Sequence, residues 1–231
     1  MAVRLLPSAG TVNSTIFVLG ATRRGKTQLI ANLVAECPRF VVFDMKNEYA
    51  PEFFGNNCKV ASNTSEFVHF LNENESQIIF NLSGYPPDDA DLVLSNALLT
   101  LYQFQLVNID SGLPPVTVAL DELNRFVETR TAPLGIKELI QRGSGVRIEK
   151  IFGAQWFGTV PSWVRDSFTE IYVFKHNDPA GLQRLSQAGF NPDEVKNLPK
   201  YHVLHENGGN IEMIALQATE QSVRQQIRVA N

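Results

Sequence analysis

The chain has 231 residues, enough to bury a substantial core and of a size suited to one α/β domain. Hydrophobic residues make up 44% of the chain and charged residues 19%, as in soluble globular proteins, and no apolar run is long enough to span a bilayer. The formal net charge of −4 argues against a protein coated in basic surface, as a non-specific nucleic-acid binder often is.

The N-terminal 14 residues contain one arginine and no apolar segment, so we expect no signal peptide. Two cysteines, Cys37 and Cys58, are too few for a disulfide framework, and the histidines do not complete a metal-binding spacing with them. These features indicate a soluble protein with free thiols in a reducing cytoplasm and no stable membrane insertion.

Short apolar runs alternate with longer helical patterns along the chain, which is typical of stacked β–α units around a mainly parallel sheet. The runs predict strands over residues 15–19, 40–43, 77–82, 116–120, 150–154 and 170–174. The helical patterns predict helices over residues 26–35, 65–73, 88–106, 133–142, 178–188 and 192–197. A small C-terminal hairpin is expected from 202–204 and 212–215, which flank a glycine-rich turn. One α/β domain over residues 1–231 is the simplest interpretation.

The strongest motif is a glycine-rich segment that fits G-x-x-x-x-G-K-[ST], follows an apolar strand and opens an amphipathic helix. Its glycines let successive backbone N–H groups point at a phosphate, and the helix N-terminus adds its dipole. Lys26 is predicted to reach the β- and γ-phosphates of ATP, and the Thr27 hydroxyl to ligate Mg²⁺. The predicted nucleotide-binding residues are Gly20, Ala21, Thr22, Arg23, Arg24, Gly25, Lys26, Thr27 and Gln28.

A second acidic motif lies at the end of the apolar run Val116–Leu120, where Asp121 and Glu122 follow directly. An aspartate at the end of a buried strand can orient water on the Mg²⁺ held by Thr27, and Glu122 is placed to polarise the attacking water as general base. This Asp-Glu pair indicates the RecA-like (ASCE) branch of P-loop NTPases, in which an extra strand separates the two motif strands. It speaks against the alternative of a non-motor nucleotide-binding protein, such as a switch or a small-molecule kinase.

Three further segments resemble the FtsK/HerA superfamily of DNA-pumping ATPases, over roughly residues 14–205. The segment Asp44-Met-Lys-Asn-Glu-Tyr49 is similar to that family's signature after the second strand, with methionine in place of proline. The run Ile151–Gln155 resembles its sensor strand, and the resemblance implies that Gln155 senses the γ-phosphate. The segment 139–146, which contains Arg142, resembles the helix and turn before that strand.

The chain shows no additional barrel, membrane anchor or winged-helix tail, and its size resembles the genome-packaging ATPases of membrane-containing icosahedral viruses. That resemblance implies an ATP-driven motor that translocates double-stranded DNA as a homo-oligomeric ring, with capsid vertex proteins as candidate partners. It also implies a location at the virion packaging vertex or in the host cytoplasm. An arginine from a neighbouring subunit would stabilise the γ-phosphate, and Arg142 and Arg147 are the candidates. A related ATPase for phage assembly or conjugation remains an alternative.

The stretch 124–150 carries six basic and three acidic residues. It could line a contact with nucleic acid or nucleotide, and a solvated helix face with a loop explains it equally well.

Overall fold

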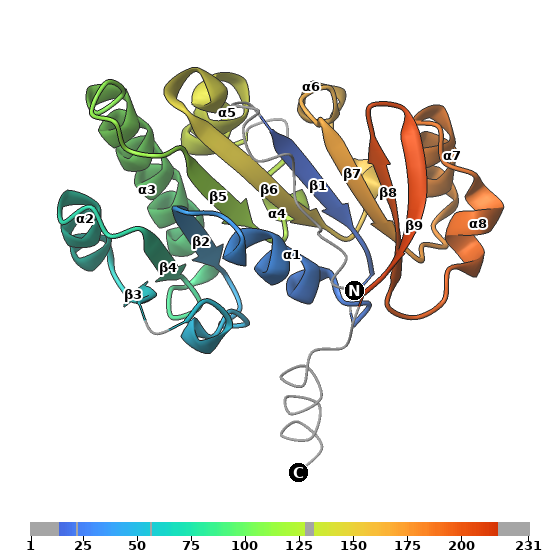
Figure 1. The fold of residues 1–231 in the computed structure, drawn as a ribbon, viewed down its shortest axis with the longest axis horizontal. Coiled ribbons are helices and arrows are strands. Elements are labelled where there is room, and N and C mark those ends of the chain that lie inside the picture. The colour runs from blue at the N-terminus through green and yellow to red at the C-terminus, as the bar shows by residue number, and fades with distance from the viewer. Residues whose placement is uncertain (1–13, 22, 56, 128–131, 217–231) are drawn as a thin grey trace, which may run out of the picture.

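The computed structural model describes residues 14–21, 23–55, 57–127 and 132–216. Their strands form one nine-stranded sheet in the order β3-β4-β2-β5-β6-β1-β7-β8-β9 (Figure 1). The strands are β1 (Thr15–Leu19), β2 (Phe40–Asp44), β3 (Lys59–Ala61), β4 (Gln77–Asn81), β5 (Val116–Leu120), β6 (Ile148–Ala154), β7 (Glu170–Phe174), β8 (His202–Asn207) and β9 (Asn210–Ala215). The first seven in chain order pair in parallel, whereas β8 and β9 add an antiparallel edge. This is the mainly parallel α/β sheet with a C-terminal hairpin that the sequence predicts.

Helices cover both faces of the sheet (Figure 1). They are α1 (Lys26–Ala35), α2 (Thr64–Asn72), α3 (Pro87–Val107), α4 (Asn124–Val127), α5 (Leu134–Arg142), α6 (Ser162–Arg165), α7 (Pro179–Gln187) and α8 (Pro192–Asn197), with 3₁₀ turns η1 (Pro51–Phe53), η2 (Gly143–Val146) and η3 (Phe157–Thr159). No helix in the described ranges is long and apolar enough to cross a membrane.

Two apolar clusters, one on each face of the sheet, form the core. Alternate residues of each central strand enter opposite clusters: Ile16 and Val18 pack with α1, while Phe17 and Leu19 pack with α3, α5 and their neighbours. Because both faces are covered, the strands are apolar at successive positions rather than at alternate ones. This double burial explains why short apolar runs predicted the strands correctly.

The position of β6 decides the class of the sheet. It lies between β1, which precedes the glycine-rich loop, and β5, which precedes Asp121. The extra strand expected from the Asp-Glu pair is therefore confirmed.

Some elements escaped the sequence prediction. β3 has only three residues, two of them exposed, so it has no apolar run. The short helices α4 and α6 span four residues each, less than the repeat that an amphipathic pattern needs. β6 begins two residues earlier than predicted, at Ile148, because the half-buried Glu149 interrupts the apolar run.

Candidate nucleotide-binding and hydrolytic site

Apart from the two candidate arginines, the predicted site residues that the structure describes gather at the carboxyl ends of the parallel strands. Leu19, the last residue of β1, pairs with Ala154, the last residue of β6. Leu120, the last residue of β5, pairs with Phe152. The glycine-rich loop, the acidic pair and Gln155 follow these three strands, so the topology places segments that are far apart in sequence beside one another.

The glycine-rich loop begins with the Gly20 amide, which donates a hydrogen bond to the Ala154 carbonyl at 3.0 Å. Gly25 has φ of 106° and ends the loop directly before α1, a backbone conformation that suits glycine. A Cβ at Gly20 would lie 3.0 Å from the Phe174 side chain. The loop therefore needs both glycines, one for its turn and one for its close packing on β7.

The remaining loop residues differ in exposure. Arg23 and Ala21 are exposed, and Arg24 is half-buried. Gln28 lies on α1, where its amide donates to the Asn32 side chain at 2.9 Å. Thr22, also predicted to bind nucleotide, lies outside the described residues.

Lys26, Thr27 and Asp121 form the centre of the site. The buried Lys26 ammonium forms an ion pair with Asp121 Oδ1. The Thr27 hydroxyl lies 3.3 Å from Asp121 Oδ2 and 3.3 Å from Glu48 Oε2. A lysine held by a single carboxylate at a helix N-terminus can exchange that partner for a phosphate, so the arrangement suits a triphosphate.

Gly153 makes room for this centre. A Cβ at that position would lie 2.2 Å from Asp121 Oδ1 and 2.8 Å from Ile30 Cδ1. The Asp121 carboxylate therefore lies directly against the backbone of β6. Gly153 lies within the run 151–155, and the sequence pattern gave no sign of this role.

Glu122 occupies a strained backbone position, since its φ of 66° is rare for a residue with a side chain. Its amide donates to Asp121 Oδ1 at 2.8 Å. Its Oε1 accepts from Gln155 Nε2 at 2.7 Å and from Lys46 Nζ at 2.6 Å. Burial raises the pKa of Glu122, but the hydrogen bonds from Lys46 and Gln155 and the charges of Lys46 and Lys26 outweigh burial and lower this pKa overall. The carboxylate is thus ionised and oriented, as a general base must be.

Asn124 anchors the segment that follows β6, a function that nothing in the sequence pattern signalled. Its Oδ1 accepts from the Gln155 amide at 2.9 Å, and its Nδ2 donates to the Trp156 carbonyl at 2.7 Å and to Thr159 Oγ1 at 2.5 Å. It lies in the short helix α4, directly after the acidic motif. Asn124 therefore ties Gln155 to the segment that presents Glu122.

The turn after β2 completes the site. The buried Asp44 carboxylate accepts three backbone hydrogen bonds, from Lys46 and Glu48 at 3.1 Å each and from Tyr49 at 2.9 Å. The Tyr49 hydroxyl is buried and makes no hydrogen bond within the described residues. Burial, with the charges of Asp121, Asp44 and Glu48, raises the pKa of Tyr49 well above its ordinary value. The family-like signature thus folds as a compact turn around Asp44, with Lys46 and Glu48 directed at the acidic centre.

The residues fit a magnesium ion of the kind that nucleotide sites hold. Among the described residues there is no group of three or more histidine, cysteine or acidic side chains arranged around a metal. Mg²⁺ in such sites needs few protein ligands, because substrate phosphates and water fill most positions. The Thr27 hydroxyl and the Asp121 carboxylate, 3.3 Å apart, supply the oxygen atoms that it prefers.

The two candidate arginines lie near the amino end of β6, whereas the glycine-rich loop lies at the carboxyl ends of the strands. Arg142 ends α5, and its guanidinium is exposed and bonds Glu138 at 3.2 Å. Arg147 directly precedes β6, whereas Gln155 directly follows it. Neither arginine reaches the site of its own chain, so any action on a γ-phosphate would have to be on a neighbouring copy.

The basic stretch 124–150 is not one surface. Lys150 is 1% exposed and donates to Ser144 Oγ at 2.6 Å, so this one lysine of the stretch is buried and cannot line a nucleic-acid contact. Arg125 is tied to Asp91 at 2.6 Å.

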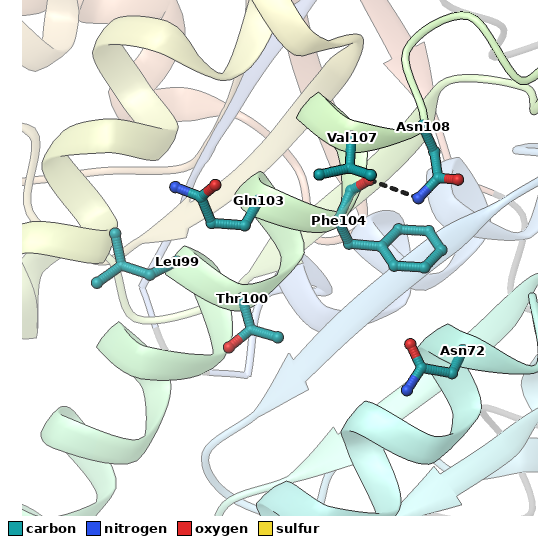
Figure 2. A pocket seen from close by; sticks show the side chains of 7 residues that line it. All are labelled: Asn72, Leu99, Thr100, Gln103, Phe104, Val107 and Asn108. Atoms are coloured by element: carbon teal, nitrogen blue, oxygen red, sulfur yellow. Dashed lines mark hydrogen bonds between the residues drawn. The ribbon is translucent and has the colours of Figure 1, made fainter.

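A hollow of about 540 Å³ lies elsewhere, between α2 and the C-terminal half of α3 (Figure 2). Figure 2 shows the side chains of Leu99, Phe104 and Val107 there, with no ionisable group among those that line it. It holds none of the predicted site residues, and its lining offers no group for phosphate chemistry.

The strand order, the glycine-rich loop before α1 and the acidic pair after β5 together define the P-loop NTPase fold. No protein-family model matches the sequence, and no curated protein matches it. Solved structures with a similar fold include the genome-packaging NTPase B204 from Sulfolobus turreted icosahedral virus 2 in complex with AMPPCP. That match has a TM-score of 0.65 and 19% identity and covers 87% of this chain and 97% of B204.

Two further similar structures come from bacteria. VirB4 of Thermoanaerobacter pseudethanolicus matches with a TM-score of 0.69 and 10% identity over 91% of each chain. The conjugative coupling protein TrwB matches with a TM-score of 0.61 and 12% identity, covering 89% of this chain and 86% of that one. The fold is therefore that of the packaging and conjugation ATPases, as the resemblance to the FtsK/HerA superfamily implied.

Proposed function

We propose that this chain is an ATP-hydrolysing motor that moves double-stranded DNA, most specifically the genome-packaging ATPase of an icosahedral virus. One observation carries the proposal: at the carboxyl ends of the parallel strands, Lys26 pairs with Asp121, and Glu122 bonds both Asp121 and Gln155. The similarity of fold to the genome-packaging NTPase B204 supports the viral assignment.

The site residues divide the hydrolytic reaction among them. The loop amides and Lys26 would bind the phosphates of ATP, and Mg²⁺ held by Thr27 and Asp121 would offset their negative charge. Glu122 would take a proton from water as the water oxygen attacks the γ-phosphorus and the bond from that phosphorus to the β–γ bridging oxygen breaks. Gln155, bonded to Glu122, would relate the position of the base to the γ-phosphate.

The motor would work as a homo-oligomeric ring around duplex DNA. In such a ring, Arg142 or Arg147 of one copy would face the γ-phosphate bound by its neighbour, which agrees with their position away from the site of their own chain. Capsid vertex proteins would be further partners, and the protein would act at the packaging vertex of the virion or in the host cytoplasm.

A related ATPase that moves another cargo is a second candidate. The fold matches VirB4 at least as well as it matches B204, with TM-scores of 0.69 and 0.65. Response to DNA separates the two candidates, because a packaging motor requires duplex DNA as its cargo.

The experiment is ATP hydrolysis by the purified protein, with and without linear duplex DNA. Lys26→Ala should abolish ATP binding, while Glu122→Gln should keep binding and lose hydrolysis, since only the proton acceptor is removed. Hydrolysis that rises with DNA and vanishes in Glu122→Gln supports the motor. Hydrolysis indifferent to DNA favours another cargo, and equal ATP binding by wild type and Lys26→Ala would refute the phosphate loop.

A further inference from the structure

β9 is the last strand of the sheet, and among the described strands it pairs with β8 alone (Figure 1). The opposite edge strand, β3, has three residues and carries Lys59, and both shortness and a lysine protect an edge from further pairing. β9 has six residues, and its Ile211 and Met213 side chains are 37% and 54% exposed. An edge of this length with exposed apolar side chains is a template for a further strand.

The register of the hairpin shows which backbone groups of β9 are available. One residue beyond β9, the Leu216 amide donates to the Tyr201 carbonyl at 2.8 Å. Hydrogen-bonded and non-hydrogen-bonded pairs alternate along an antiparallel ladder, so every second residue from Ile214 back bonds β8. The N–H and C=O groups of Ile211 and Met213 therefore face the free edge.

We propose that residues 2–6 of the same chain, Ala-Val-Arg-Leu-Leu, pair with β9 as an added antiparallel strand. The run is far shorter than the apolar core of a signal peptide, but its length suits a strand beside β9. Pro7 follows it directly, and proline has no N–H with which to continue a ladder, so the added strand ends there. This interaction concerns the edge of the sheet and is independent of the proposed ATPase function.

Charge and apolar pattern select one register for the added strand. The Glu212 side chain is 69% exposed, and its contact with His205 is long at 3.4 Å, which leaves the carboxylate open to a second partner. Arg4, the one charged residue of the segment, lies opposite Glu212 in this register. Its sequence neighbours then lie opposite the two exposed apolar residues of β9: Val3 opposite Met213, and Leu5 opposite Ile211. Directly opposed residues share a face of a sheet, so apolar side chains meet on one face and opposite charges on the other.

The chain is long enough to reach β9 from β1. The pairing places Ile16, near the start of β1, level with Asn210, the first residue of β9. Four strand spacings, about 19 Å, separate β1 from a strand added outside β9. Residues 7–13 link the segment to Ser14 and span up to about 23–25 Å when extended. Since β9 runs in the same direction as β1, a strand that leads back to the start of β1 runs antiparallel to β9, as the register requires.

A disulfide between Val3→Cys and Met213→Cys tests the register in the full-length chain, with Cys37 and Cys58 replaced by serine. Hydrogen-bonded partners in an antiparallel ladder have Cα atoms about 5.5 Å apart, within the range of a disulfide. Oxidation should give a monomer with an internal disulfide. It should be at least about ten-fold faster than in the matched control, Arg4→Cys with Met213→Cys, whose side chains point to opposite faces. Equal oxidation rates would overturn the inference, and so would disulfide-linked dimers, because the strand would then come from a second copy.

Charge exchange tests the ion pair of Arg4 with Glu212. In the Val3→Cys, Met213→Cys chain, Arg4→Glu should slow disulfide formation by about two- to five-fold, the factor that corresponds to an exposed ion pair. Adding Glu212→Arg should restore the rate, because the pair forms again with its charges exchanged. A rate unchanged by Arg4→Glu, or not restored by Glu212→Arg, would overturn this register. ATP hydrolysis by the same chains is a separate readout, so failure of the pairing leaves the proposed function standing.

Discussion

Gly153 offers a direct test of how the site is built, through the substitution Gly153→Ala. The added methyl would lie 2.2 Å from Asp121 Oδ1, 2.9 Å from Asp121 Cγ and 2.8 Å from Ile30 Cδ1. Asp121 is 8% exposed and is bound to Lys26 and to the Glu122 amide, so it cannot swing into solvent without losing those bonds. The substitution should therefore cost stability and displace the acidic centre together.

The expected cost follows from overpacking. Forcing a methyl into a filled core costs about 1–3 kcal/mol. For a chain of this size each kcal/mol lowers the midpoint of thermal unfolding by roughly 2–4 °C. The rate of ATP hydrolysis should also fall, beyond what the loss of folded protein explains, because Asp121 and Glu122 are adjacent and share a hydrogen bond.

Urea unfolding and ATP turnover of the same preparations would measure both effects. Gly143→Ala is the control, since its methyl would meet only ordinary contacts at 3.5 Å with Ile148 and Leu139. In an Asp121→Ala background the clash with the carboxylate disappears, so the cost of Gly153→Ala should shrink. A Gly153→Ala protein with wild-type stability and turnover would refute the packing of Asp121 described above.

Three further substitutions test other parts of the molecule. Asn124→Ala should lower kcat more than it changes KM and should destabilise the fold by about 1–3 kcal/mol, because the Gln155 backbone amide and the Trp156 carbonyl lose their partner. Steady-state kinetics and urea unfolding measure the two effects, and an unchanged kcat would contradict the prediction. Burial lowers the pKa of His205, but hydrogen bonds to Glu170 and Glu212 outweigh burial and raise it. Its stabilising contribution is therefore complete below its unfolded pKa of about 6.5 and disappears as pH rises through the folded pKa, so wild type should lose more unfolding free energy than His205→Gln between about pH 6 and pH 9. Burial lowers the pKa of Lys150 to about 8, although the charge of Glu149 opposes the shift. Below that pH the folded protein holds a buried ammonium, which costs stability. Lys150→Met should therefore raise the unfolding free energy at neutral pH by about 1–3 kcal/mol. Wild type alone should then gain stability as pH rises from about 8 to 10, and equal pH profiles for wild type and Lys150→Met would argue against this pKa.

The sequence predicted the sheet well because its central strands are buried on both faces. A continuous apolar run such as Val116–Leu120 is stable only where both of its faces are buried, and its length suits a strand. The glycine-rich loop was equally visible, since its residue types follow from phosphate geometry. Contacts across long sequence separations were not visible: Lys46 with Glu122 and Asn124 with Gln155 depend on strand order, which local pattern does not encode.

The strand order also explains why the acidic centre needs a glycine. Since β6 lies between β1 and β5, the strand that leads into the glycine-rich loop and the strand that leads to Asp121 are two strand spacings apart, about 9–10 Å. A short aspartate cannot bridge that distance by itself, so the long lysine side chain must meet it above β6. They can meet there only if the residue beneath has no side chain, and Gly153 directly follows Phe152, the partner of Leu120 in the sheet. The inserted strand therefore favours both a long side chain at the start of α1 and a glycine in β6, and a larger residue at 153 is incompatible with this placement of Asp121.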